Sequence, residues 1–185
     1  MTTSYFSPVE TWCLTEEALL DSLAEMARDG VRGNEGVVLW LGRREKGRAD
    51  ISHLVALRGP TVIKRPDLLL IDAAMLNDVT DVAIGLGVSL IGQIHTHGGS
   101  HGTDLSRTDR VGGVNVPYYL SVVAPDFGLR AGTHISDCGV HVFEPDFGYR
   151  RLSRPEIARR VHVVSGARVP LVTVGDAAAE GDLDR

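Results

Sequence analysis

Residues 88–110, VSLIGQIHTHGGSHGTDLSRTDR, constrain the fold more than any other segment of the chain. An apolar run typical of a buried strand ends on His95, Thr96 and His97, and small and polar residues follow as far as Asp109. Successive side chains of a strand point to opposite faces. One face should therefore carry Leu90, Gly92, Ile94 and Thr96, and the other Ile91, Gln93, His95 and His97. We predict that the two imidazoles project in the same direction at the C-terminal end of this strand.

Two imidazoles on one face of a strand can bind a single metal ion. Catalytic zinc sites commonly add one carboxylate to such a pair and leave a fourth position for water. We expect Asp109 to be that carboxylate, because SRTD resembles the first turn of a helix, where Ser106 and Asp109 share a face. The same pattern also fits a capping box without chemistry. Asp104 is an alternative carboxylate, His101 can approach from the loop, and other divalent ions are tolerated by such ligands.

The remaining apolar patterns predict an α+β protein with helices around a mixed sheet. In chain order they predict a helix over 15–30, a hairpin of 37–41 and 51–57, a second amphipathic helix over 65–87, strands over 88–96, 116–125 and 139–145, and a short helix with a last strand over 153–164. Thr15 is expected to cap the first helix and Gly30 to end it.

Composition bounds the class of protein. A chain of 185 residues suits one domain with a full core, which we expect over residues 1–165, with an acidic, disordered tail over 166–185. A net charge of -5 argues against a nucleic-acid binder that relies on a basic surface. Cys13 and Cys138 lack CxxC spacing, which indicates a reducing cytoplasm. We expect neither a signal peptide nor a segment that enters a membrane.

The order of HxH, a glycine-rich loop and S-x-x-D resembles the JAMM motif of the JAB/MPN metalloprotease family. Glu35, in NEGVVLWLG, precedes His95 by sixty residues and resembles the glutamate that this family carries upstream. The resemblance covers about residues 12–150. Eight residues separate His97 from Ser106 where the family has seven, and Gly98 stands where the family usually has proline. A loop with two glycines can absorb one extra residue at little cost.

This resemblance implies the MPN/JAB fold, a mixed β-sheet flanked by helices and similar to that of cytidine deaminases. It implies one zinc ion per chain, held by His95, His97 and Asp109. Glu35 would act as general base and then general acid, and Ser106 would donate a hydrogen bond to the oxyanion. The implied reaction cleaves a peptide or isopeptide bond after the C-terminal glycine of a ubiquitin-like protein, either in deconjugation from targets or in precursor processing.

Within that family, the compact chain is most similar to stand-alone bacterial members, some of which belong to ubiquitin-like conjugation or anti-phage operons. Three alternatives remain: a non-catalytic MPN scaffold that binds partners, a DNA-repair-associated relative, and a peptidase acting on a small conjugate. The complete set of candidate ligands argues against the scaffold. The acidic charge, and the absence of a helix-hairpin-helix-like segment at the N-terminus, argue against the DNA-repair branch. Oligomeric state and linkage preference leave no mark in the sequence.

Overall fold

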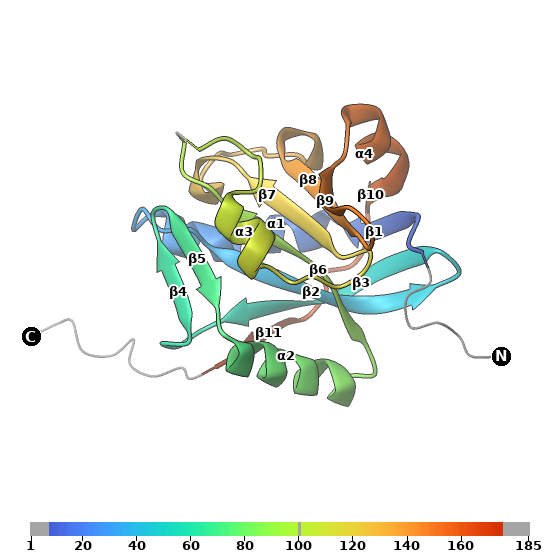
Figure 1. The fold of residues 1–185 in the computed structure, drawn as a ribbon, viewed down its shortest axis with the longest axis horizontal. Coiled ribbons are helices and arrows are strands. Elements are labelled where there is room, and N and C mark those ends of the chain that lie inside the picture. Colours follow the sequence, from blue (N-terminus) through green and yellow to red (C-terminus); the bar gives the residue numbers. More distant parts are fainter. Residues whose placement is uncertain (1–7, 100, 176–185) are drawn as a thin grey trace, which may run out of the picture.

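A computed structural model describes residues 8–99 and 101–175 and confirms the α+β class (Figure 1). The strands are β1 (Thr11–Thr15), β2 (Val37–Glu45), β3 (Arg48–Leu57), β4 (Val62–Arg65), β5 (Leu68–Ile71), β6 (Ser89–Thr96), β7 (Leu120–Ala124), β8 (Gly139–Glu144), β9 (Gly148–Arg151), β10 (Val161–Val164) and β11 (Leu171–Val174). The helices are α1 (Glu16–Gly30), α2 (Ala73–Gly85), α3 (Arg107–Gly112) and α4 (Arg154–Arg160), with 3₁₀ turns η1 (Asp126–Gly128) and η2 (Ile135–Asp137). None of the described helices is both long enough and apolar enough to cross a membrane.

One mixed sheet of nine strands forms the centre of the molecule. Its order is β10-β1-β3-β2-β6-β7-β8-β9. Strand β11 also pairs with β3: β1 pairs with the start of β3, and β11 pairs with its end along the same edge. Strands β4 and β5 form a separate hairpin. Strands β6 and β7 run parallel, so their C-terminal ends lie at the same edge of the sheet.

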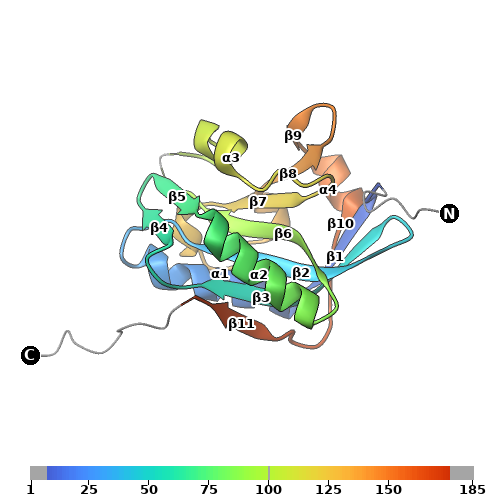
Figure 2. The same ribbon diagram turned by 60° about the horizontal axis from the view of Figure 1, so that its bottom comes forward.

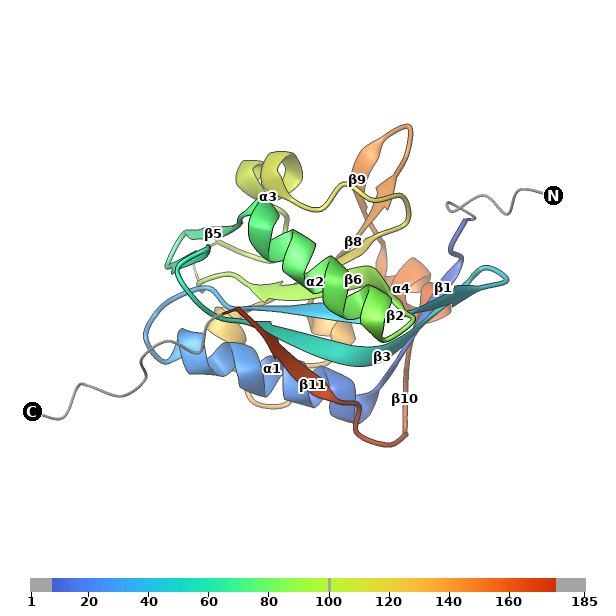
Figure 3. The same ribbon diagram turned by 90° about the horizontal axis from the view of Figure 1, so that it is seen from below.

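Helices α1 and α2 cover opposite faces of this sheet (Figures 2 and 3). On β2, Val38 and Trp40 pack with the core on the α1 side, whereas Val37, Leu39 and Leu41 pack with α2. Because both faces of β2 are buried, its sequence is a continuous apolar run and not an alternating one.

Helix α1 begins where the sequence predicts. The Oγ1 atom of Thr15 accepts a hydrogen bond from the N–H of Ala18 at 3.1 Å, which satisfies one of the free donors of the first turn. Gly30 is the last helical residue and Val31 forms the C-cap, so the predicted end is correct to one residue. A Cβ atom on Gly30 would lie 2.3 Å from the carbonyl oxygen of Phe127. Glycine at this position therefore permits close packing of the η1 turn against the end of α1.

Strand β6 forms as predicted but contains a bulge. Trp40 pairs with Gly92 and Leu41 pairs with Leu90, so Ile91 is the extra residue on β6. Ile91 consequently packs on the α1 side, and the predicted alternation is wrong for Leu90 and Ile91. From Gly92 onward the alternation holds, so the direction of the two histidines is unaffected.

The prediction of one helix over 65–87 is wrong for its first part. Residues 68–71 form β5 and pair with β4, and the helix begins only at Ala73. The cause is local, because the Oδ1 atom of Asp72 accepts a hydrogen bond from the N–H of Met75 at 2.8 Å and so caps the helix there. Four consecutive apolar residues fit either a helix or a strand, and periodicity could not separate the two.

The expected tail over 166–185 is wrong for residues 171–174. These residues form β11 and pair in parallel with Leu54–Leu57 of β3. Val174 is buried in the core on the α2 side. The run LVTV is short but β-branched and apolar, and it gains stability from pairing with a strand far away in the sequence. The sheet thus extends beyond the predicted boundary at residue 165, and residues 176–185 lie outside the described part of the chain.

Candidate metal centre

The two histidines of the HxH pattern lie at the C-terminal end of β6. His95 is paired with Val37 of β2 and Val123 of β7, so hydrogen bonds on both sides hold its backbone. His97 follows the strand, and its N–H donates to the carbonyl oxygen of Ala124 at 3.1 Å. Both side chains are buried, with exposed fractions of 0% and 4%. The imidazoles therefore have fixed directions before any ligand binds.

Asp109 joins the histidines through a capping box. The Oγ atom of Ser106 accepts from the N–H of Asp109 at 3.1 Å, and the N–H of Ser106 donates to Oδ2 of Asp109 at 2.7 Å. The same Oδ2 atom lies 3.2 Å from Nε2 of His97 and 3.7 Å from Nε2 of His95. The capping box and the ligand hypothesis are thus compatible, because the cap turns the carboxylate toward the imidazoles.

These three side chains fit a divalent cation. Their potential ligand atoms all lie within 4.8 Å of one another. A tetrahedral zinc site with bonds of about 2.0–2.1 Å places neighbouring ligand atoms about 3.3 Å apart, close to the two observed separations. The Nε2 atom of His95 is buried and has no hydrogen-bond partner among the described residues. A bound cation would satisfy this nitrogen.

The charges around His95, His97 and Asp109 favour a positive charge at the centre of the cluster. Burial on its own would raise the pKa of Asp109, but the neighbouring His95 and His97 outweigh it and hold that pKa well below its usual range. Burial likewise opposes a charge on His97, yet its hydrogen bond to Asp109 and the charges of Asp109 and Glu35 raise the pKa of His97. The surroundings of His97 therefore favour its protonated form more than water does.

Glu35 lines a cavity together with His97 and Asp109. Its N–H donates to the carbonyl oxygen of Arg65 at 3.0 Å, and the next residue, Gly36, exchanges two hydrogen bonds with Thr96. Thr96 points away from the metal cluster, as strand parity predicts, and its hydroxyl accepts from Gly36 at 2.8 Å. The residue between the two histidines thus positions the backbone beside the glutamate.

The carboxyl group of Glu35 is poised to exchange a proton near neutral pH. Burial raises its pKa from 4.5 to about 7; the charge of His97 lowers this pKa, and those of Asp109 and Asp67 add to the rise. Its exposed fraction is only 5%. A carboxyl with a pKa near the working pH can both accept and donate a proton, as general acid–base catalysis requires.

Gly36 offers a test of how this loop is held. A Cβ atom there would lie 2.9 Å from backbone and side-chain atoms of Met26 in α1. We expect Gly36→Ala to lower the free energy of unfolding by about 1–3 kcal/mol, as overpacking of a core does. The measurement is urea-induced unfolding of metal-free protein. The control is Gly85→Ala on α2, where a Cβ meets nothing within 4 Å and should be neutral or stabilising. Equal effects of the two substitutions would contradict this account.

Gln93, Ser121 and Tyr119 form a buried polar network beside Nδ1 of His95. The sequence alone assigned these three residues no role in the site. The Nε2 atom of Gln93 lies 3.3 Å from Nδ1 of His95 and 3.4 Å from Oγ of Ser121. The hydroxyl of Tyr119 donates to Oε1 of Gln93 at 3.2 Å. A metal on Nε2 requires a proton on Nδ1, and rotation of the Gln93 amide by half a turn presents an oxygen to accept it. The sequence did contain an indication of this role, because Gln93 precedes His95 by two residues and therefore lies on the same face of the strand.

Asp104, the alternative carboxylate, lies away from the histidine pair. Its Oδ1 atom is 2.8 Å from Nε2 of the buried His141 on β8 and 3.1 Å from Nη2 of Arg110. Beside it, the carbonyl oxygen of Thr103 would lie 1.6 Å from a Cβ on Gly139. Asp104 and Thr103 therefore anchor the loop to strand β8.

A neighbouring aromatic ring restricts which residue fits at position 98. A Cβ atom on Gly98 would lie 2.6 Å from the ring of Phe127. The N–H of Phe127 donates to the carbonyl oxygen of His97 at 2.9 Å, so the ring is held over this part of the loop. Glycine fits at position 98 because the aromatic ring of Phe127 occupies the space that a larger side chain would need.

A cavity of about 200 Å³ lies in front of the cluster. Glu35, His97 and Asp109 form its inner wall, and Ser106 and the exposed His101 line it from the loop. Leu68 and Leu69 of β5 also line it. All five residues that the sequence assigned to the site therefore lie together: Glu35, His95, His97, Ser106 and Asp109.

No model of a known protein family matches the sequence, and no curated protein matches it. Solved structures do resemble the chain. The solution structure of a Desulfitobacterium hafniense protein has a TM-score of 0.62 at 15% identity, covering 84% of this chain and 94% of that one. A Salinibacter ruber protein has a TM-score of 0.48 at 19% identity, covering 82% of this chain and 90% of that one. At such identity the likeness to the Desulfitobacterium hafniense protein shows a shared fold alone.

Proposed function

We propose that the chain is a zinc-dependent isopeptidase or peptidase of the JAB/MPN fold. It would cleave after the C-terminal glycine of a ubiquitin-like protein. The observation that carries this proposal is the convergence of Glu35, buried and with a raised pKa, on the cluster of His95, His97 and Asp109. Two imidazoles, one carboxylate and a nearby glutamate are the donor set and the base that metal-assisted hydrolysis requires.

His95, His97 and Asp109 would hold the metal. When bound there, zinc supplies a Lewis acid and lowers the pKa of coordinated water to about 7. Glu35 accepts the proton of the attacking water and donates it to the leaving amine. The hydroxyl of Ser106 accepts from the N–H of Asp109 and also hydrogen-bonds the Asp109 carboxylate, and it would turn its proton toward the developing oxyanion. A donor of this kind typically contributes about 3 kcal/mol.

The hairpin of β4 and β5 supports an extended substrate. Among the described strands, β4 and β5 pair only with each other, so β5 keeps one edge without a strand partner. Leu68 and Leu69 of β5 line the cavity in front of the metal ligands. A peptide tail can add to such an edge through main-chain hydrogen bonds. Glycine suits the last positions of the tail, because a cavity of about 200 Å³ leaves little room for side chains.

The direct test is cleavage of ubiquitin-like proteins fused through their C-terminal Gly-Gly to a reporter. We expect the zinc-loaded chain to cut after the second glycine, and 1,10-phenanthroline to abolish cleavage until zinc is restored. Replacing both glycines of the tail by alanine should lower kcat/KM at least about tenfold, the usual effect of a poorly fitting methyl group in a narrow site. If no fusion in a broad panel is cut, the proposal fails and the non-catalytic scaffold becomes the better hypothesis.

A further inference from the structure

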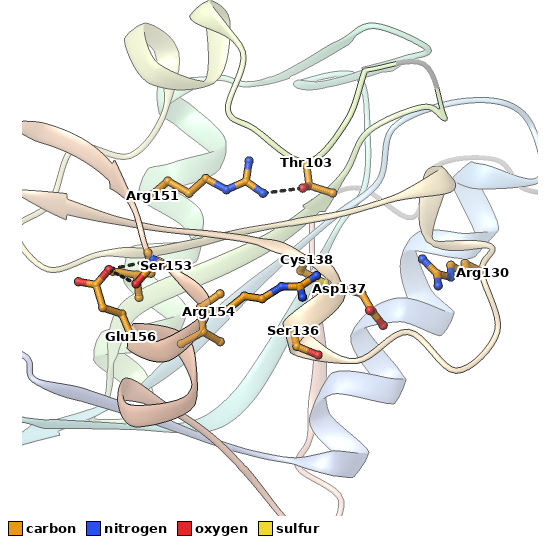
Figure 4. A pocket seen from close by; sticks show the side chains of 11 residues that line it. Thr103, Arg130, Ser136, Asp137, Cys138, Arg151, Ser153, Arg154 and Glu156 are labelled. Carbon is orange, nitrogen blue, oxygen red and sulfur yellow. Dashed lines mark hydrogen bonds between the residues drawn. The ribbon is translucent and has the colours of Figure 1, made fainter.

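A second and larger cavity lies beside the loop between β6 and α3, which we call the metal-site loop (Figure 4). Its volume is about 740 Å³, within the range of small-molecule binding sites. Residues of η2 and of α4, together with the end of β9 and Arg130 from the segment between η1 and η2, line it. Thr103 lines this cleft, whereas the next residue, Asp104, lines the metal cavity. We refer to it below as the arginine cleft, after Arg130, Arg151 and Arg154.

Three guanidinium groups border the cleft in a chain whose net charge is -5. Arg151 donates to Oγ1 of Thr103 at 2.9 Å (Figure 4). Its Nη1 atom lies 3.9 Å from Oδ1 of Asp104. Arg130 and Arg154 have no ion-pair partner within residues 8–99 and 101–175. Positive charges that face one cavity repel each other, and folding alone gives no reason to gather them there.

The two acidic residues that line the cleft are already engaged. Oδ2 of Asp137 accepts from the N–H of His134 at 3.0 Å. Oε2 of Glu156 accepts from the N–H of Ser153 at 2.8 Å, and its Oε1 accepts from Arg150 at 2.9 Å. These hydrogen bonds direct both carboxylates to partners other than Arg130 and Arg154. With three arginines against two carboxylates along its lining, the cleft keeps an excess of positive charge.

The floor of the cleft is apolar. Cys138, Leu152 and Ile157 line it and are buried. A low-dielectric floor strengthens the attraction between a guanidinium and an anion above it. Burial also raises the pKa of the Cys138 thiol to about 12, so the sulfur stays protonated and is no nucleophile. These features suit binding and not covalent chemistry.

We propose that the arginine cleft binds a small ligand bearing anionic oxygens, phosphate or carboxylate, through Arg130 and Arg154, with Arg151 on the side of the metal-site loop. Arginine suits this role because its planar fork matches both groups in a bidentate manner. The cleft is separate from the metal ligands, so this inference is independent of the proposed peptidase activity.

The test is NMR titration of the ¹⁵N-labelled full chain with inorganic phosphate and, separately, with succinate, at constant ionic strength. We expect saturable shifts of the backbone amides of residues 136–138 and 151–154. Arg130→Gln and Arg154→Gln should each weaken binding at least about tenfold, the effect of losing one hydrogen bond to a charged group. Arg159→Gln, an exposed arginine on α4 outside the cleft, is the matched control and should leave affinity unchanged.

The two probes identify the source of the anion. Tighter binding of phosphate would assign the cleft to phosphorylated ligands, and equal or tighter binding of succinate would assign it to polycarboxylates. Shifts that never saturate and spread over exposed cations would overturn the proposal, as would shifts confined to the metal cavity. An equal loss of affinity in Arg159→Gln would also refute it.

Discussion

Replacing Glu35 by glutamine is expected to lower kcat/KM for a cleavable fusion by about 100-fold to 10,000-fold while zinc content stays at one per chain. Glutamine preserves the shape of the side chain but cannot carry the proton from water to the leaving amine, and a positioned general base typically contributes that factor. Glu35 lines the cavity without belonging to the cluster of potential metal ligands, so glutamine leaves all three ligands in place. The measurements are steady-state cleavage and elemental analysis of the same sample.

The control for Glu35→Gln is Asp67→Asn, which neutralises an exposed carboxylate on the rim of the same cavity. It should leave kcat/KM within about threefold of wild type, as screened surface charges do.

The Glu35→Gln substitution should not destabilise the fold. A carboxyl whose pKa rises from 4.5 to about 7 on folding costs stability once the pH exceeds 4.5. Undiminished cleavage by Glu35→Gln would remove this residue from the mechanism.

The pH profile gives the same residue a second signature. A general base must be ionised, so kcat/KM should rise with pH as Glu35 loses its proton. The pKa of about 7 applies without metal, and a bound divalent cation favours the carboxylate. The midpoint of the acid limb should therefore lie below pH 7. The residual activity of Glu35→Gln should lack that limb.

The second large effect concerns the metal ligand that the sequence alone left open. Wild-type protein is expected to hold about one zinc per chain, Asp109→Ala to hold almost none, and Asp104→Ala to retain it. Only Asp109 lies within reach of both imidazoles, whereas Asp104 is bonded to His141 and Arg110. Elemental analysis after dialysis checks the ratio.

Thermal unfolding offers an independent measure of the same ligand. Zinc at 100 times its Kd stabilises the fold by about 2.7 kcal/mol. In a domain of this size that amount raises Tm by about 5 to 10 °C. The rise should be present in wild type and Asp104→Ala and absent in Asp109→Ala. Asp109→Asn separates the ligand from the cap, because the amide oxygen can still accept from Ser106. Loss of zinc in Asp104→Ala with retention in Asp109→Asn would reverse the assignment.

Local patterns were sufficient for most elements of the fold. Helix α1, the β2–β3 hairpin and the histidine strand follow from caps, turn residues and apolar runs, all of which act within a few residues. The two elements that were wrong are short strands. Strand β5 pairs with the neighbouring β4 in a hairpin, whereas β11 pairs with β3, from which it is separated by more than a hundred residues. Four apolar residues do not specify such partners.

The sequence by itself determined that His95 and His97 share one face, because the period of a strand is a local property of the backbone. It also placed Ser106 and Asp109 together, because a helix cap spans only three residues. Which carboxylate meets the histidines was decided by the tertiary structure, since His141 of β8 and Arg110 of α3 draw Asp104 away from them. Arg65 and Thr96, which are distant in sequence, likewise hold the loop of Glu35 beside the cavity, and burial there raises the pKa of Glu35. Desolvation and charge depend on everything packed around a group, and only the folded chain assembles those surroundings.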